Sequence, residues 1–226
     1  EVTIRGVVVG DYSDAGELTG FYVQNIDGET DGDAATSDGI FVYLGDATTM
    51  LPDVNEGDLV TLTGTVDEYY GQTQIDTVSY LTVEATDQLD LVTAATMTIG
   101  DAGSYLEGTT YEMYEGMLVT LPQELVVSEY YQFSRYGQIT LTLEDRPYQY
   151  TQVNTPDAAG YAAWVADLAA DQIILDDSTN AQNTYTGDTD VLPYGATGLS
   201  VDNQFSGGDS ISGLTGVLSW TYAGQS

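Results

Sequence analysis

The fold is decided by GDLVTLTGTVDEYYGQ, residues 57–72, because this stretch occurs a second time in the chain. The second copy is GDSISGLTGVLSWTYAGQ, residues 208–225. Both copies begin with Gly-Asp, contain Leu-Thr-Gly and end in Gly-Gln after an aromatic-rich run, and the second has one extra residue on each side of Leu-Thr-Gly. A repeat of this kind predicts two related modules in one chain.

The openings of the two modules also match, since IRGVVV at residues 4–9 corresponds to YEGMLV at residues 114–119. We therefore expect module 1 over residues 1–92 and module 2 over residues 93–226, joined near residues 93–103. Gly, Asp and Thr interrupt short apolar runs throughout the sequence, which is typical of short strands joined by turns. The sequence predicts an all-β protein.

Module 1 carries five segments in which apolar and polar residues alternate. Such alternation predicts strands with one buried face, so we expect a five-stranded unit. The segments lie near residues 2–12, 19–25, 39–44, 58–68 and 73–84.

Module 2 contains a predicted helix near residues 156–170. Pro156 suits the first turn of a helix, and Tyr161 and Trp164 fall on the expected apolar face, so we expect both aromatics in the core. The run QIIL at residues 172–175 predicts the next strand, which places the helix between strands three and four, where OB-folds commonly carry one. The predicted fold is two tandem OB-fold-like five-stranded barrels, the second with this inserted helix.

The two copies of the repeat differ in the sequence that comes after them. Module 1 continues with the strand expected at residues 73–84, whereas the sequence stops at Ser226, directly after the second copy. Module 2 is therefore expected to lack its closing strand. Either the sequence is trimmed there, or another chain supplies the strand, which would be strand complementation between subunits.

Charge sets the chain apart, with 36 Asp and Glu against three Arg, no Lys and no His, for a formal net charge of −33. Such a surface repels polyanions and suits high salt or divalent cations, which screen the self-repulsion. The charge is either a solvated coat adapted to a marine or halophilic medium, or partly organised into cation sites.

The composition removes most catalytic mechanisms. His, Cys and Lys are absent, so the usual proton carriers and activated nucleophiles are missing. A pair of carboxylates or a carboxylate-held metal remains, but among so many acidic residues close pairs arise by chance. We expect no enzyme, and no apolar run reaches the ~20 residues of a membrane span.

The candidate metal site is the acidic loop NIDGETDGDAATSDG at residues 25–39. Carboxylates at alternate positions between glycines suit a hard cation such as calcium. A polar turn-rich loop with no bound ion explains the same pattern. The candidate ligands are Asp27, Glu29, Asp31, Asp33 and Asp38, the last standing where an EF-hand has its twelfth-position Glu.

Aromatic residues are abundant, with 18 Tyr that include the pairs Tyr69-Tyr70 and Tyr130-Tyr131. OB-folds that bind nucleic acids combine stacking aromatics with a basic groove, and three Arg cannot offset a charge of −33. Nucleic acid is therefore disfavoured as a partner unless cations bridge to it. We expect the tyrosines at interfaces with other protein chains.

Module 1 contains the runs GFYVQN, DGDAATSDGIFVY and GDLVTLTGTV, and module 2 contains YEGMLV, YGQI and ILDD. In this order the runs resemble the N-terminal OB-like region of large secreted bacterial endonucleases of the ExeM/NucH type. The resemblance covers nearly the whole chain and implies a secreted protein from a saline source with a tandem OB-like architecture. The catalytic domain of that family lies downstream of this region, so no catalytic residue is carried over.

These observations support two hypotheses. The leading one is a non-catalytic extracellular or cell-surface structural protein that associates with copies of itself, forms filaments by strand complementation and is stabilised by calcium. The alternative is an accessory OB-fold segment of a secreted endonuclease that helps to bind DNA or to position the catalytic domain. A third hypothesis, carbohydrate binding by exposed Tyr and Trp220, has no specific spacing behind it.

Overall fold

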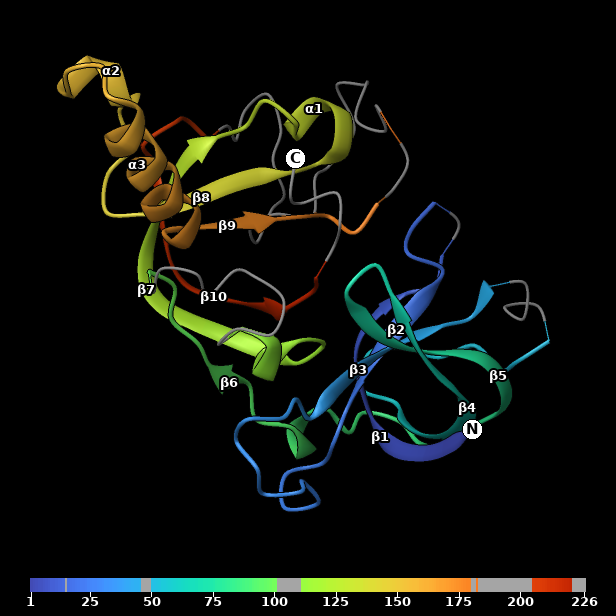
Figure 1. Ribbon diagram of the computed structural model, residues 1–226. Helices are drawn as coiled ribbons and strands as arrows, with labels where there is room; N and C mark the ends of the chain where they lie inside the picture. Colours follow the sequence, from blue (N-terminus) through green and yellow to red (C-terminus); the bar gives the residue numbers. More distant parts are fainter. Residues whose placement is uncertain (15, 46–49, 101–110, 180–181, 183–204, 221–226) are drawn as a thin grey trace. The chain divides into compact units, whose positions relative to one another are not determined.

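The computed structural model describes residues 1–14, 16–45, 50–100, 111–179, 182 and 205–220. Strands dominate, so the prediction of an all-β protein is confirmed (Figure 1). The chain divides into two compact units. Unit 1 comprises Glu1–Met97, Thr110–Thr120 and Thr215–Ser226, and unit 2 comprises Thr98–Thr109 and Leu121–Leu214.

Unit 1 is built on a closed five-stranded barrel with the strand order β1-β2-β3-β5-β4. Its pairs are antiparallel except for β3 and β5, which run parallel with Phe41 opposite Gln74 and Val42 opposite Ile75. All five strands lie where the alternation predicted them. They are β1 (Val2–Tyr12), β2 (Gly20–Gln24), β3 (Gly39–Tyr43), β4 (Leu59–Tyr69) and β5 (Gln72–Ala85).

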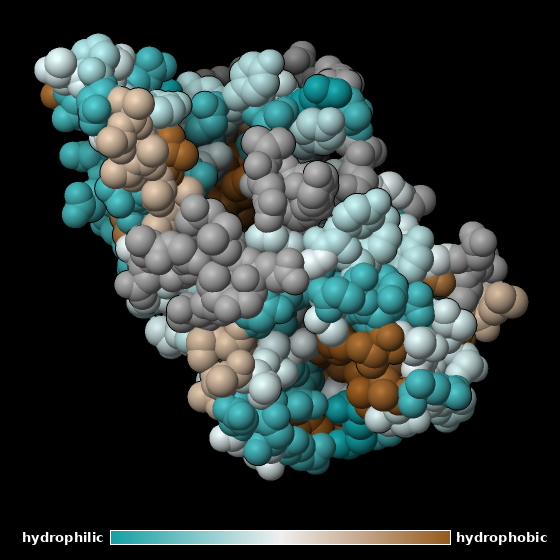
Figure 2. Space-filling view, in the orientation of Figure 1, coloured by the Kyte–Doolittle hydropathy of each residue, from teal (hydrophilic) through white to brown (hydrophobic). Residues whose placement is uncertain are grey.

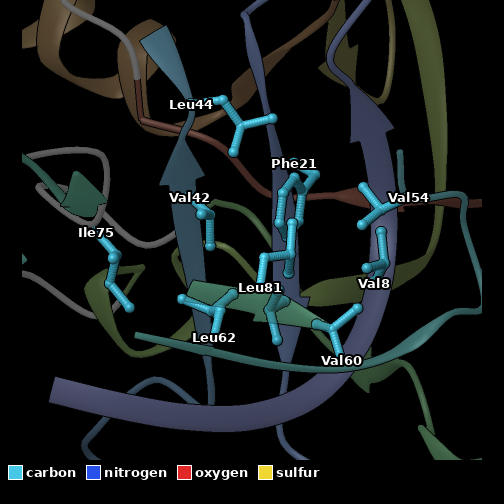
Figure 3. Packing of buried hydrophobic residues seen from close by; sticks show 10 residues of the cluster. Val8, Phe21, Val42, Leu44, Val54, Val60, Leu62, Ile75 and Leu81 are labelled. Atoms are coloured by element: carbon cyan, nitrogen blue, oxygen red, sulfur yellow. The ribbon is translucent and has the colours of Figure 1, made fainter. Parts of the chain in front are cut away.

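The core of this barrel receives side chains from every strand (Figure 3). Strand β5 contributes Ile75 and Leu81, and without it the barrel would be neither closed nor filled. Burying a side chain of this size contributes about 1.5–3 kcal/mol. The buried members of the cluster are Val8, Phe21, Val23, Val42, Leu44, Val54, Val60, Leu62, Ile75 and Leu81.

A second apolar cluster of unit 1 is covered by segments from the other half of the sequence. Leu118 and Val217 pack against a group that includes Tyr22 and Phe41. Residues 111–118, which we call the strap, contain the short 3-10 helix η3 (Glu112–Tyr114). Distant parts of the chain thus complete unit 1. The 3-10 helix η2 (Leu89–Leu91) contributes Leu89 and Leu91 to the same packing.

The strap is held to the barrel by backbone groups. Leu118 N donates to Gln24 Oε1 of the barrel over 2.8 Å. Gly116 N donates over 2.7 Å to the carbonyl of Leu218, which follows residue 217 and is not part of the barrel. At Gly39 a Cβ atom would lie 2.3 Å from Gly116 O, so only glycine permits this approach.

A second sheet has the strand order β10-β7-β8-β9, and β6 (Ala95–Thr96) pairs with β7 outside this path. Its strands are β7 (Leu118–Glu129), β8 (Ile139–Leu143), β9 (Gln172–Leu175) and β10 (Ser210–Val217). Three helices accompany it: α1 (Phe133–Tyr136), α2 (Tyr150–Val153) and α3 (Ala158–Ala170).

The repeat found in the sequence recurs in the hydrogen bonds. Val8 N donates to Asp58 O and Gly57 N to Val8 O, both over 2.8 Å. In the second sheet Val127 N donates to Asp209 O and Gly208 N to Val127 O, again both over 2.8 Å. A register shift also follows Val8 in β1 and Val127 in β7. Strand β7 is therefore the counterpart of β1, and β10 is the counterpart of β4.

A second pair of contacts supports this correspondence. The Oγ1 atoms of Thr3 and Thr63 lie 2.8 Å apart, as do those of Thr120 and Thr215. The match expected between residues 4–9 and 114–119 was therefore wrong. Most of residues 114–119 belongs to the strap. The counterpart of β1 is β7, which begins only at Leu118.

Helix α3 lies where the sequence predicted it, with Asp157 as its N-cap accepting from Gly160 N over 2.6 Å. Two expectations about it were wrong. The helix follows β8, the counterpart of β2, rather than the third strand of the module. Tyr161 is 52% exposed and Trp164 is only half-buried, because their rings stack on one another at 5.7 Å instead of entering the core.

Candidate functional site

The candidate site is the pair of free edges in the second sheet. The order β10-β7-β8-β9 reproduces β4-β1-β2-β3 of the closed barrel, where β5 then joins β3 to β4. In the described part of the chain no strand joins β9 to β10. We call the free edges of β9 and β10 the acceptor edge.

Strand pairing identifies the matching core positions in the two sheets. Val8 lies opposite Val23, and Val127 lies opposite Leu141. The next pairing, Phe21 with Val42, corresponds to Ile139 with Leu175. On β10, the repeated Leu-Thr-Gly matches Leu214 to Leu62.

Burial of the matched positions differs only on the two strands of the acceptor edge, which no described strand joins. On the first two strands, Val127, Ile139 and Leu141 are buried like their counterparts in the barrel. On the two strands of the acceptor edge the pattern changes. Val42, Val60 and Leu62 are 0% exposed in the barrel, whereas their counterparts Leu175, Ile211 and Leu214 are only half-buried.

A matched pair of glycines gives the same result. A Cβ atom at Gly64 would lie 2.4 Å from Ile75 Cγ2 and 2.7 Å from Asp76 O, both of which belong to β5. At Gly216, the counterpart of Gly64, a Cβ atom would meet none of the described atoms within 4 Å. The space that β5 fills in unit 1 is therefore not filled by described residues beside β10.

The acceptor edge also lacks the features that normally protect a free edge. Edge strands are usually blunted by charged side chains or Pro, which prevent pairing with another chain. The sequences QIIL of β9 and SISGLTGV of β10 contain neither, in a chain with 17% charged residues. Both strands can accept backbone hydrogen bonds from an added strand without burying a charge.

The predicted metal ligands lie in the loop between β2 and β3, and two of them have other partners. The Asp27 carboxylate accepts Thr93 N over 3.0 Å and Thr93 Oγ1 over 2.6 Å, which holds the pKa of Asp27 below its usual range. Glu29 forms an ion pair with Arg5 over 3.1 Å. Glu29 thus ties the loop to β1, and Asp27 ties it to the segment that follows η2 (Leu89–Leu91).

The other three carboxylates stabilise turns or neighbours within the loop. Asp31 accepts from Asp33 N over 2.8 Å, and Asp38 accepts from Asn25 Nδ2 over 3.0 Å. Asp33 accepts from Ala35 N over 3.0 Å. Among the residues that the structure describes, no three or more Asp, Glu, His or Cys are grouped so that they could hold a metal ion. The calcium site stays a prediction.

A buried acid in the strap was not among the candidates from the sequence. Glu115 is 8% exposed; its Oε1 accepts from Thr73 N over 3.0 Å and its carbonyl accepts from Ser37 Oγ over 2.6 Å. Burial, together with the nearby carboxylates of Glu112 and Glu68, raises the pKa of Glu115 to about 8. A single acid within the apolar run YEGMLV was the available signal.

The predicted tyrosine pairs are exposed. Tyr69 and Tyr70 meet edge to face at 4.7 Å at the end of the β4–β5 hairpin, and Trp220 Nε1 donates to Tyr70 O over 3.3 Å. Tyr131 is 82% exposed. On the face of the molecule that Figure 2 shows, hydrophilic and intermediate residues predominate and brown residues lie in separate areas. Tyr69 and Tyr131 therefore present exposed ring surface.

Comparison with protein-family models, with curated proteins and with solved structures gives no significant match for this chain. No helix in the described residues is long and apolar enough to cross a membrane.

Proposed function

We propose that this protein is a non-catalytic, extracellular scaffold that assembles with copies of itself by strand complementation. The observation that carries the proposal is the acceptor edge. Half-buried apolar residues and backbone groups that no described strand pairs lie together where the closed barrel has β5. Another chain that supplied the strand would bury both, and repeating this contact between copies would produce a filament.

The OB-fold is part of the proposal for both modules. The order β1-β2-β3-β5-β4 with a parallel β3–β5 pair is consistent with a five-stranded Greek-key barrel of this type. The strand correspondence extends the argument to the second module. The extracellular location rests on the acidic composition and on the resemblance to secreted endonucleases.

A scaffold fits the chemistry of the chain better than an enzyme does. The sequence has no His, Cys or Lys. Among the described carboxyl groups the most strongly raised pKa is that of Glu115, which is a buried residue of the strap and accepts a hydrogen bond from Thr73 N of β5. A group that is buried and engaged in this way cannot exchange protons with a substrate in solution.

The alternative, a DNA-binding accessory segment, receives no support from the arginines. Arg5 is paired with Glu29 and Glu84. Arg146 donates to Ser128 O over 2.9 Å, and Arg135 donates to Gln182 Oε1 over 2.9 Å. Each guanidinium therefore already has a partner within its own chain.

Assembly of chains that each carry −33 requires screening of that charge. We propose salt or calcium for this role, with the loop at residues 25–39 as the candidate calcium site. The loop would have to rearrange, because Asp27 and Glu29 are held by Thr93 and Arg5.

Negative-stain electron microscopy and sedimentation velocity on the full chain test the proposal. Samples at low and high salt, with calcium and with a chelator, should give ordered polymers under screening conditions and dispersed particles without screening. Monomers under every condition would refute self-assembly.

A further inference from the structure

We infer that the acceptor edge binds an extended strand of β5 chemistry, which runs parallel to β9 and antiparallel to β10 and inserts apolar side chains between them. The inference rests on the proposed function in one respect only, namely that a second copy donates the strand. Because β5 closes that copy's own barrel, the donation would be an exchange of β5 between copies. The chemistry, direction and register of the strand follow from the closed barrel of the same chain.

The direction along β9 follows from the parallel pairing of β3 and β5. Phe41 lies opposite Gln74, and Val42 lies opposite Ile75. Ile174 and Leu175 are the counterparts of Phe41 and Val42, since they pair with β8 as Phe41 and Val42 pair with β2. The incoming strand therefore presents an apolar side chain opposite Leu175.

The direction along β10 follows from the antiparallel pairing of β4 and β5. Leu62 lies opposite Leu81 in that pairing, and Leu214 is the counterpart of Leu62. The incoming strand should therefore place a second apolar side chain opposite Leu214. This donor residue comes six positions after the first, as Leu81 comes after Ile75.

The open space beside Gly216 fits this register. In the barrel, Ile75 and Asp76 of β5 occupy the position next to Gly64. An inserted strand would bring the same two donor positions next to Gly216, where glycine leaves room for them. A helix or a folded surface could not follow both edges, because it has no continuous row of free backbone groups to pair with them.

The uncharged edges restrict the donor further. β5 has a low charge, with acidic groups only at Asp76 and Glu84, so its insertion adds little repulsion at the site. A strongly acidic segment would be repelled by a chain of net charge −33.

A synthetic peptide, QTQIDTVSYLTVEA, with the sequence of β5 tests the inference on the full chain. We expect the labelled peptide to bind, measured by fluorescence anisotropy, and to slow amide hydrogen exchange in β9 and β10 at least about tenfold while β1–β4 stay unchanged. The control peptide carries Ile75→Asp and Leu81→Asp and should bind at least about tenfold more weakly. Equal binding of both peptides, or protection outside β9 and β10, would overturn the inference.

Disulfide trapping tests direction and register, because the chain has no native cysteine. Protein variants Leu175→Cys and Leu214→Cys are each combined with peptides carrying Ile75→Cys or Leu81→Cys. We expect bonds between positions 175 and 75 and between positions 214 and 81, since opposed residues lie within disulfide range. The exchanged pattern, 175 with 81 and 214 with 75, would refute the direction.

The outcomes separate this inference from the proposed function. Peptide binding at β9 and β10 by a chain that never polymerises supports the acceptor edge and refutes self-assembly. Polymers that form while the peptide neither binds nor inhibits their growth refute the acceptor edge and leave assembly to another surface.

Discussion

The barrel of unit 1 and the second sheet share four strands in the same order and differ in the fifth. Their shared hydrogen bonds, such as Val8 with Asp58 and Val127 with Asp209, are equally short in both. The difference lies in three core positions, which are fully buried beside β5 and half-buried at the acceptor edge. The comparison indicates that four strands suffice to set the backbone pairing, whereas the fifth strand is needed to bury the core.

The largest expected difference concerns the matched leucines Leu62 and Leu214. Leu62→Ala should lower the free energy of unfolding of unit 1 by about 3 kcal/mol, because the residue is fully buried. Leu214→Ala should lower the free energy of unfolding of unit 2 by only about 1 kcal/mol, because the Leu214 side chain is only half-buried. Urea unfolding followed by tryptophan fluorescence resolves the two, with Trp220 reporting on unit 1 and Trp164 on unit 2. Equal losses would contradict the comparison.

A second prediction concerns the strap, which unit 1 uses to cover its outer cluster. Because the pKa of Glu115 is raised to about 8 in the folded chain, the folded state holds a proton that the unfolded state has released between about pH 4.5 and 8. Stability from this group is therefore fully present below about pH 4.5 and is lost as the pH rises toward 8.

The size of this effect should be about 4 kcal/mol between these pH values. The other titratable groups around it are Glu112, Glu68 and Tyr22. Glu115→Gln should remove the dependence and be more stable than the wild type at pH 9, measured by urea unfolding across pH. The exposed Glu124→Gln is the control and should keep the wild-type slope. A Glu115→Gln variant with that same slope would show that another group titrates.

The glycine pair Gly64 and Gly216 provides a third test. Gly64→Ala should destabilise unit 1 by about 2 kcal/mol, because the added methyl group would collide with β5. Gly216→Ala should change the stability of the free chain by less than about 0.5 kcal/mol, yet weaken binding of the β5 peptide. Thermal melts and anisotropy measure the two effects, and a large destabilisation by Gly216→Ala would mean that the space is already filled.

The smallest expected effect is that of calcium on the loop between β2 and β3. If calcium binds there, it should raise the melting temperature of the wild type, since a ligand that binds only the folded state stabilises it. The Asp31→Ala plus Asp33→Ala variant should lose this rise, measured against the same variant without calcium. An unchanged rise would assign the calcium effect to other carboxylates.

Much of the fold was predictable because strands leave a local signal. Alternation located all five strands of the barrel, and the apolar spacing after Pro156 located α3, although Pro156 precedes the N-cap Asp157 and is not in the first turn as expected. Which side chains α3 buries was not predictable. Its apolar spacing suggested Tyr161 and Trp164 as core residues, but the helix buries Ala170 and leaves the aromatic rings to pack on one another.

The candidate site was predictable only in outline. The repeat predicted that module 2 lacks the strand that follows the repeat in module 1. The expected match between residues 4–9 and 114–119 was misleading. The buried Glu115 could not be recognised either, since its burial depends on Thr73 and Ser37, which are far away in sequence.

The sequence by itself determined the repeat, the strands, the charge and the absence of the usual catalytic side chains, because each of these depends on residue type and short-range spacing. Tertiary structure alone decided which residues of the two modules correspond, which acid is buried and where the core stays half-open. The physical reason is that burial depends on which distant segment pairs with an edge. In unit 1 that segment is β5, and beside β9 and β10 no described segment takes its place.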